Sequence, residues 1–166
     1  MKTFFSAFLA CLFVAAPCQA TVRISIDLSK QRLTATRGDG ETVIWKISSG
    51  RPGYETPSGR YSVMRMEADH FSDEYDQAPM PYAIFFSPRG LAIHGSYERG
   101  LGSPRSHGCV RLGVGNAEKL FQWVEAQGAT IEIVGATPGR GGPGHERRVR
   151  RRVPEPEIPL DQAYRY

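Results

Sequence analysis

The chain has 166 residues, of which 21 are lysine or arginine and 17 are aspartate or glutamate, so its formal net charge is +4. This length is enough for one domain of ordinary size with additional ends. Residues 21–135 contain equal numbers of basic and acidic side chains, and the excess positive charge lies mainly after residue 135. A neutral folded part argues against nucleic acid as a partner.

The first 20 residues predict a secretory signal peptide. Lys2 precedes an apolar run over residues 4–16, and small residues at positions 18 and 20 indicate cleavage after Ala20. The apolar run is too short to span a bilayer comfortably, so no transmembrane segment is expected after cleavage. We therefore expect an exported protein.

Cleavage would leave a single cysteine. Cys11 and Cys18 belong to the predicted signal peptide, so Cys109 would be the one thiol of the mature chain. A single thiol cannot form an internal disulfide bond, and an unpaired cysteine in an exported protein indicates either intermolecular pairing or a reactive thiol. The residues around Cys109 favour the reactive thiol.

Three segments of alternating apolar and polar residues open the predicted mature chain, at 21–28, 32–37 and 42–48. This alternation is typical of half-buried strands, and the short turns between the segments predict an antiparallel meander. A segment rich in glycine, proline and threonine, 50–59, predicts a rigid loop, and alternation resumes over 60–66.

Residues 67–81 are polar, contain five acidic residues and show no hydrophobic period. They predict a long loop, which is either a lid or binding loop over a site or a solvated connector. Residues 82–86 and 90–94 then predict two paired strands, the second of which ends at His94.

One helix is predicted, over residues 116–127. Asn116 is expected to cap its N-terminus, Glu118 suits the positive end of the helix dipole, and Gly128 is expected to close the helix. Residues 130–134 predict a final strand.

Residues 136–166 are rich in arginine, proline and glycine and lack an apolar period, which predicts a disordered tail after a domain over residues 21–135. The arginine cluster at 147–152 would suit anionic envelope polymers or lipid head groups in an exported protein. A solubilising tail without a specific partner is the alternative.

The reactive residue types gather in one glycine-rich segment. Cysteine chemistry needs a thiolate, which at neutral pH needs a base or a positive neighbour. His107 lies two residues before Cys109, and His94 lies fifteen residues before it. Gly108 lets the backbone approach a ligand closely or adopt a positive φ. Arg111 supplies a planar fork of donors that suits a carboxylate.

A zinc site is the alternative reading of the same residues, with His94, His107 and Cys109 as ligands. Structural zinc sites use four protein ligands and catalytic sites usually three. The other two histidines, His70 and His145, lie in unpromising places for a further ligand. We therefore expect neither a metal nor another cofactor.

The segment 106–112, S-H-G-C-V-R-L, with the pair His94-Gly95 upstream, resembles the catalytic signature of the L,D-transpeptidase (YkuD) family. The resemblance extends over about residues 22–134. It implies a mostly β fold, with two sheets arranged like a sandwich and one main helix packed on them. Three further segments match the family's pattern: Thr56–Gly59, Asp69–Ser72 and Ala78–Tyr82.

The resemblance also implies an activity, the cross-linking of peptidoglycan stem peptides in the periplasm or cell wall. Cys109 would attack a tetrapeptide stem, release D-Ala and form a thioester, which an amine then resolves. His94 matches the family's general base and His107 a supporting histidine, although proximity in the chain favours His107 as the base. The remaining predicted site residues are expected to stabilise the oxyanion or to bind the substrate. They are Gly108, Ser106, Arg111, Gly95, Tyr82 and Met80.

Two alternatives remain open at this point. Water in place of the amine would make the protein an L,D-carboxypeptidase or a hydrolase with the same thioester chemistry. A wall-binding module without catalysis, acting through its basic tail, would leave Cys109 with ordinary thiol reactivity.

Overall fold

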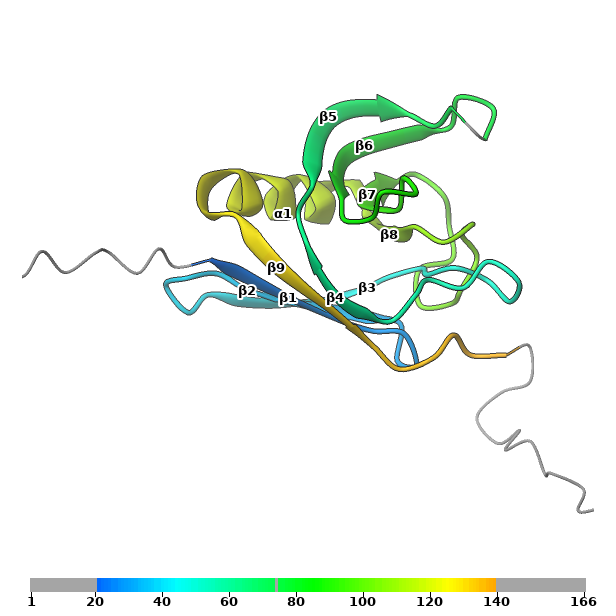
Figure 1. Ribbon diagram of the computed structural model, residues 1–166, viewed down its shortest axis with the longest axis horizontal. Helices are drawn as coiled ribbons and strands as arrows, with labels where there is room; N and C mark the ends of the chain where they lie inside the picture. The colour runs from blue at the N-terminus through cyan, green and yellow to red at the C-terminus, as the bar shows by residue number, and fades with distance from the viewer. Residues whose placement is uncertain (1–20, 74, 140–166) are drawn as a thin grey trace, which may run out of the picture.

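The computed structural model describes residues 21–73 and 75–139. These residues form two β-sheets and one helix, which confirms the predicted mostly β fold (Figure 1). The predicted signal peptide, 1–20, and residues 140–166 of the predicted tail lie outside the described residues. Within the described part of the chain, no helix is both long enough and apolar enough to cross a bilayer.

The first sheet has five strands in the order β3-β2-β1-β9-β4. The predicted antiparallel meander forms its first three strands, and β9 runs parallel to β1 and antiparallel to β4. The last strand of the domain therefore lies inside this sheet, between β1 and β4. The bounds are β1 Val22–Asp27, β2 Arg32–Thr36, β3 Thr42–Lys46, β4 Gly59–Ser62 and β9 Ala129–Val134.

The second sheet has four strands in the order β5-β6-β7-β8. Neighbouring strands are antiparallel except β7 and β8, which are parallel and are joined by a long connection. Parallel neighbours cannot be joined by a tight turn, so the chain must cross over between them. The bounds are β5 Arg65–Phe71, β6 Pro79–Phe85, β7 Ala92–Ser96 and β8 Val110–Gly113.

Two predictions for the middle of the chain were wrong. The segment 60–66 is not one strand, because the chain leaves the first sheet after β4 and enters the second at Arg65. Residues 67–81 are not one long loop, because most of them belong to the hairpin of β5 and β6. Residues on both faces of β5 are exposed or half-buried, so this strand shows no hydrophobic alternation.

Helix α1 spans Val114–Gln127 and begins directly after β8. Its N-cap is Gly113, with an extended backbone and no capping side chain, so the prediction that Asn116 caps the helix was wrong. The first turn contains no acidic residue, which also removes the role expected for Glu118. Gly128 closes the helix as predicted, with φ of 68° and its N–H donating to the carbonyl of Val124.

The main core joins both sheets and the helix. Residues buried in this core come from β1, β2, β6, β7, β8, β9 and α1. Burying one such aliphatic or aromatic side chain stabilises the fold by about 1.5–3 kcal/mol. The helix packs chiefly against β6 and β7, and Figure 1 shows it lying over the face of the first sheet. Its buried residues are Ala117, Leu120, Phe121, Trp123 and Val124.

Candidate active site

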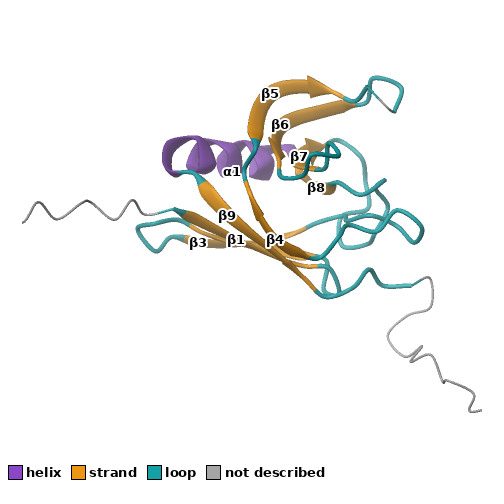
Figure 2. Cartoon of the chain, viewed as in Figure 1, coloured by secondary structure: helices purple, strands orange, loops and turns teal. Residues whose placement is uncertain are grey.

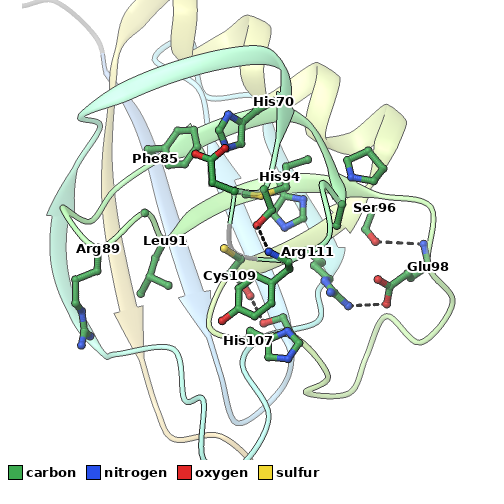
Figure 3. Close-up of a pocket in the computed structure, with 18 of the residues that line it drawn as sticks. His70, Phe85, Arg89, Leu91, His94, Ser96, Glu98, His107, Cys109 and Arg111 are labelled. Carbon is green, nitrogen blue, oxygen red and sulfur yellow. Dashed lines mark hydrogen bonds and ion pairs between the residues drawn. The ribbon is translucent and has the colours of Figure 1, made fainter.

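A cavity of about 290 Å³ opens beside β7 and the start of β8. Figure 2 shows that loops gather at this end of the molecule, away from the free end of α1. Figure 3 shows Cys109, His94 and His107 around this one cavity. The predicted site residues that line it are Met80, His94, Ser106, His107, Cys109 and Arg111.

Strand alternation explains why these side chains meet. Ile93 of β7 pairs with Val110 of β8, and both are buried in the main core. Since successive residues of a strand point to opposite faces, the next pair, His94 and Arg111, faces the cavity. Cys109, one residue before Val110, lies on the same face and packs against a small second apolar cluster.

The imidazole of His94 is held by the residue that follows it. His94 is 5% exposed, and its Nδ1 donates to the carbonyl of Gly95 at 2.7 Å. Because a carbonyl only accepts, Nδ1 carries the proton and Nε2 of the neutral ring has a free lone pair. Gly95 has no room for a side chain, since an added Cβ would lie 3.1 Å from Cα of Val114 and 3.2 Å from Pro81.

Burial lowers the pKa of His94 to about 4, and the bond to the Gly95 carbonyl opposes this effect. The charges of Arg111 and His70 act in the same direction as burial and contribute to this value. The ring is therefore neutral at pH 7, the state in which Nε2 accepts a proton.

This shift predicts a pH dependence of stability. The unfolded chain protonates His94 near pH 6.5, whereas the folded protein resists protonation until about pH 4. As the pH falls between these values the unfolded state binds more protons, and the free energy of unfolding loses roughly 3 kcal/mol. Urea unfolding at pH 7 and pH 4 should show a smaller loss in His94→Gln than in the wild type. An equal loss of unfolding free energy in both proteins would show that His94 is not the group whose lowered pKa causes the pH dependence.

His107 is held differently. Arg51 donates from Nη2 to Nε2 of His107 at 2.7 Å, so the proton of the neutral ring lies on Nδ1. Tyr75 stacks on the ring at 4.2 Å, and Tyr54 meets it edge-on at 4.9 Å. Burial and the charges of Arg51 and Arg111 lower the pKa of His107. Its Nε2 is thus already occupied as an acceptor.

Ser106 braces the turn before Cys109. Its buried hydroxyl accepts from the N–H of Gly108 at 3.1 Å and donates to the carbonyl of Cys109 at 2.6 Å. Thr56 donates to the carbonyl of Gly108 at 2.8 Å, which gives the Thr-Pro-Ser-Gly segment a structural role here. Ser106 therefore shapes the backbone, and the Gly108 amide predicted as an oxyanion donor is engaged in this conformation.

Gly108 is required at its position by geometry. Its φ is +121°, a value that L side chains rarely adopt, and an added Cβ would meet Cδ2 of Leu91 at 2.9 Å. Leu91 also lines the cavity, so a larger residue would push one wall of the site. This confirms the expected positive φ.

Arg111 and Met80 border the cavity as expected, but Tyr82 does not. Arg111 donates from Nη1 to Glu98 at 2.7 Å, and Met80 belongs to the apolar cluster beside Cys109. Tyr82 packs against Phe121 of the helix at 5.9 Å and is not among the lining residues. A hydrogen bond to Glu118 raises the pKa of the Tyr82 hydroxyl.

The backbone of Tyr82 nevertheless shapes the site, because its φ is +57°. In the pairing of β5 with β6, Arg65 lies opposite Phe85 and His70 lies opposite Met80. The two pairs are five residues apart on each strand. In regular strands residues five apart point to opposite faces, yet all four of these side chains line the cavity. The alternation is therefore inverted between the two pairs, where Tyr82 lies.

Several residues at the site were missed by sequence reasoning. Arg51 and Tyr54 lie in the glycine- and proline-rich loop, far from Cys109 in the chain, and Glu98 lies in the connection between β7 and β8. His70, set aside as a zinc ligand, lines the cavity. The signal that pointed to His70 was the match of Asp69–Ser72 to the family pattern. Over residues 21–73 and 75–139, no three His, Cys, Asp or Glu side chains form a metal-binding group.

Comparison with known proteins defines the class. A sequence profile of the L,D-transpeptidase catalytic domain (YkuD) matches residues 21–140. The chain therefore belongs to this family. No curated protein matches the chain significantly.

Solved structures agree in fold. An L,D-transpeptidase from Stackebrandtia nassauensis is 26% identical with a TM-score of 0.64, and the match covers 78% of this chain and 63% of that one. A mutant L,D-transpeptidase from Enterococcus faecium is 25% identical with a TM-score of 0.60, over 69% and 50% of the chains. L,D-transpeptidase 3 from Mycobacterium tuberculosis, in complex with a faropenem-derived adduct, is 24% identical with a TM-score of 0.60, over 70% and 61%. The match therefore spans 50% to 63% of the solved chains.

Proposed function

We propose that this protein is a peptidoglycan L,D-transpeptidase in which Cys109 forms a thioester with a tetrapeptide stem. The observation that supports this most directly is the fixed tautomer of His94 at the cavity it shares with Cys109. A neutral imidazole with an available Nε2 is the group that a thiol needs in order to become a thiolate.

His94, rather than His107, is the base in this proposal. The Nε2 of His107 accepts from Arg51 at 2.7 Å, so a proton could reach it only after that contact breaks. The ring of His94 is held through Nδ1, which donates to the Gly95 carbonyl, so its acceptor nitrogen Nε2 is the atom that would take the thiol proton. His107 then supports the turn that carries Cys109.

The reaction would proceed in two steps. The Cys109 proton passes to His94, the thiolate attacks the stem carbonyl, and the D-Ala amine leaves with that proton, so that the C–N bond breaks and a thioester remains. An amine then attacks the thioester, a new C–N bond forms and the thiol is restored. The backbone amide of Cys109 itself is the proposed donor to the tetrahedral oxyanion, because the Gly108 amide is engaged by Ser106, and Arg111 is proposed to bind a substrate carboxylate.

The test uses the purified protein and a carbapenem, followed by muropeptides. We expect an intact-mass increase equal to one carbapenem molecule, because the opened ring stays attached as a thioester, and peptide mapping assigns it to Cys109. With muropeptides we expect cross-linked dimers, whereas tripeptides alone would indicate the carboxypeptidase alternative. Absence of any adduct, together with unchanged muropeptides, would contradict both enzyme activities and favour the wall-binding alternative.

Export to the periplasm or cell wall belongs to the same proposal, since the substrate lies there. It is supported by the signal-like residues 1–20 and by family membership. Contact of the basic tail with anionic envelope polymers remains a prediction from sequence.

A further inference from the structure

A second imidazole–carboxylate pair lies on the cavity wall. Nδ1 of His70 donates to Oε2 of Glu67 at 2.7 Å, and Arg65 pairs with the other carboxylate oxygen of Glu67. Arg65 in turn lies over the ring of Phe85 at 3.4 Å, and His70 meets the same ring edge-on at 5.0 Å. All these residues come from the β5–β6 hairpin, so the pair is held by one rigid element.

The pair presents one ring nitrogen of His70 for chemistry. Because Glu67 binds Nδ1, the Nε2 lies on the opposite side of the ring. The His70 side chain is 16% exposed and lines the cavity that Cys109 and His94 also line, as Figure 3 shows. The charged or titratable groups that face His70 are Glu67, Arg65 behind it, and His94 across the cavity.

The second step of the proposed reaction also needs a proton acceptor, and His70 places a second imidazole on the wall of the same cavity. In the first step the proton that His94 receives from the thiol leaves with the D-Ala amine. In the second step the incoming amine must lose a proton as it bonds to the thioester carbon.

We propose that His70, oriented by Glu67, is the general base that activates the acceptor amine. This inference rests on the proposed thioester mechanism. An amine N–H proton passes to Nε2 of His70, the C–N bond forms, and the C–S bond breaks with its electron pair on the Cys109 sulfur. The proton on His70 returns to solvent, and the thiolate takes up a proton. His94 thus serves the thiol and His70 serves the amine.

The two half-reactions can be measured separately. A tetrapeptide muropeptide is mixed with the full protein, and the thioester is followed by rapid quenching and intact mass. Dimer formation is then followed after a second muropeptide with a free diaminopimelate amine is added. For His70→Gln we expect thioester formation within about twofold of wild type and dimer formation slower by about a hundredfold, with accumulation of the thioester.

Matched variants complete the experiment. Glu67→Gln should slow dimer formation less than His70→Gln, because the amide can still accept from Nδ1. Glu132→Gln is the control, since Glu132 also binds an arginine, Arg60, but lies on β9 of the other sheet. Equal slowing of both half-reactions in His70→Gln, or unchanged dimer formation, would overturn the inference. A wild-type protein that forms no thioester would instead overturn the proposed function, and the inference with it.

Discussion

Replacing Cys109 with alanine is expected to abolish both the carbapenem adduct and the cross-linked dimers. The sulfur is the atom that bonds to the stem carbonyl, and no other group at the cavity can replace it as a nucleophile of comparable strength. Loss of the nucleophile in a serine hydrolase lowers kcat by about 10⁶-fold. A similar loss here would leave no product within the detection limit of muropeptide chromatography.

The fold should tolerate this change. Cys109 is half-buried against the cluster of Met80, Ala83, Phe85 and Ala92, and alanine removes only the sulfur. Thermal unfolding of the variant serves as the control, with an expected decrease of only a few degrees. Dimer formation by a well-folded Cys109→Ala protein would end the proposal.

Replacing His94 with glutamine is expected to slow thioester formation by about 10²–10⁴-fold, the usual contribution of a general base. Glutamine keeps a polar side chain near the Gly95 carbonyl but cannot take the proton of the thiol. The residual rate should rise with pH toward the ordinary thiol pKa of about 8.5, because only the thiolate already present can react.

His107→Gln provides the comparison for His94→Gln. Since Nε2 of His107 is occupied by Arg51, we expect a smaller loss in thioester formation and no new dependence on pH. Stopped-flow acylation by a carbapenem from pH 5 to pH 9 measures both variants. If His107→Gln were the slower protein and acquired the pH dependence, the roles of the two histidines would have to be exchanged.

The sequence predicted the strands along which apolar and polar side chains alternate. It missed the strand that lacks this alternation. The first three strands and the last were found because one face of each meets the core. The hairpin of β5 and β6 was missed because β5 has partly exposed residues on both faces, and its alternation inverts near Tyr82. The position of β9 next to β1 depends on contacts with residues more than one hundred positions away, which no local pattern encodes.

The candidate site was predictable where its residues are close in the chain or match the family signature. Cys109, His107 and His94 follow from that segment, and the cavity gathers all three. Arg51 was not predictable, because it is 56 positions from His107 in the chain. A β-bridge between their neighbours Gly50 and Ser106 brings the two side chains together. The Glu67–His70 pair was hidden within an expected loop, since its function depends on a strand that the pattern did not reveal.

The second half of the connection between β7 and β8 is bonded to residues 47–49, since the amide of Gly102 donates to the carbonyl of Ile47 and Ser48 donates to the carbonyl of Ser103, both at 2.7 Å. The amides of Arg105 and Ser106 both donate to the carbonyl of Ser49, at 2.9 and 3.0 Å, just before the turn that carries Cys109. Insertions or deletions between Tyr97 and Gly100 would therefore alter the rim of the cavity without displacing the sulfur. Relatives could evolve different substrate preferences by changing the length of this one segment while the reacting groups stay in register.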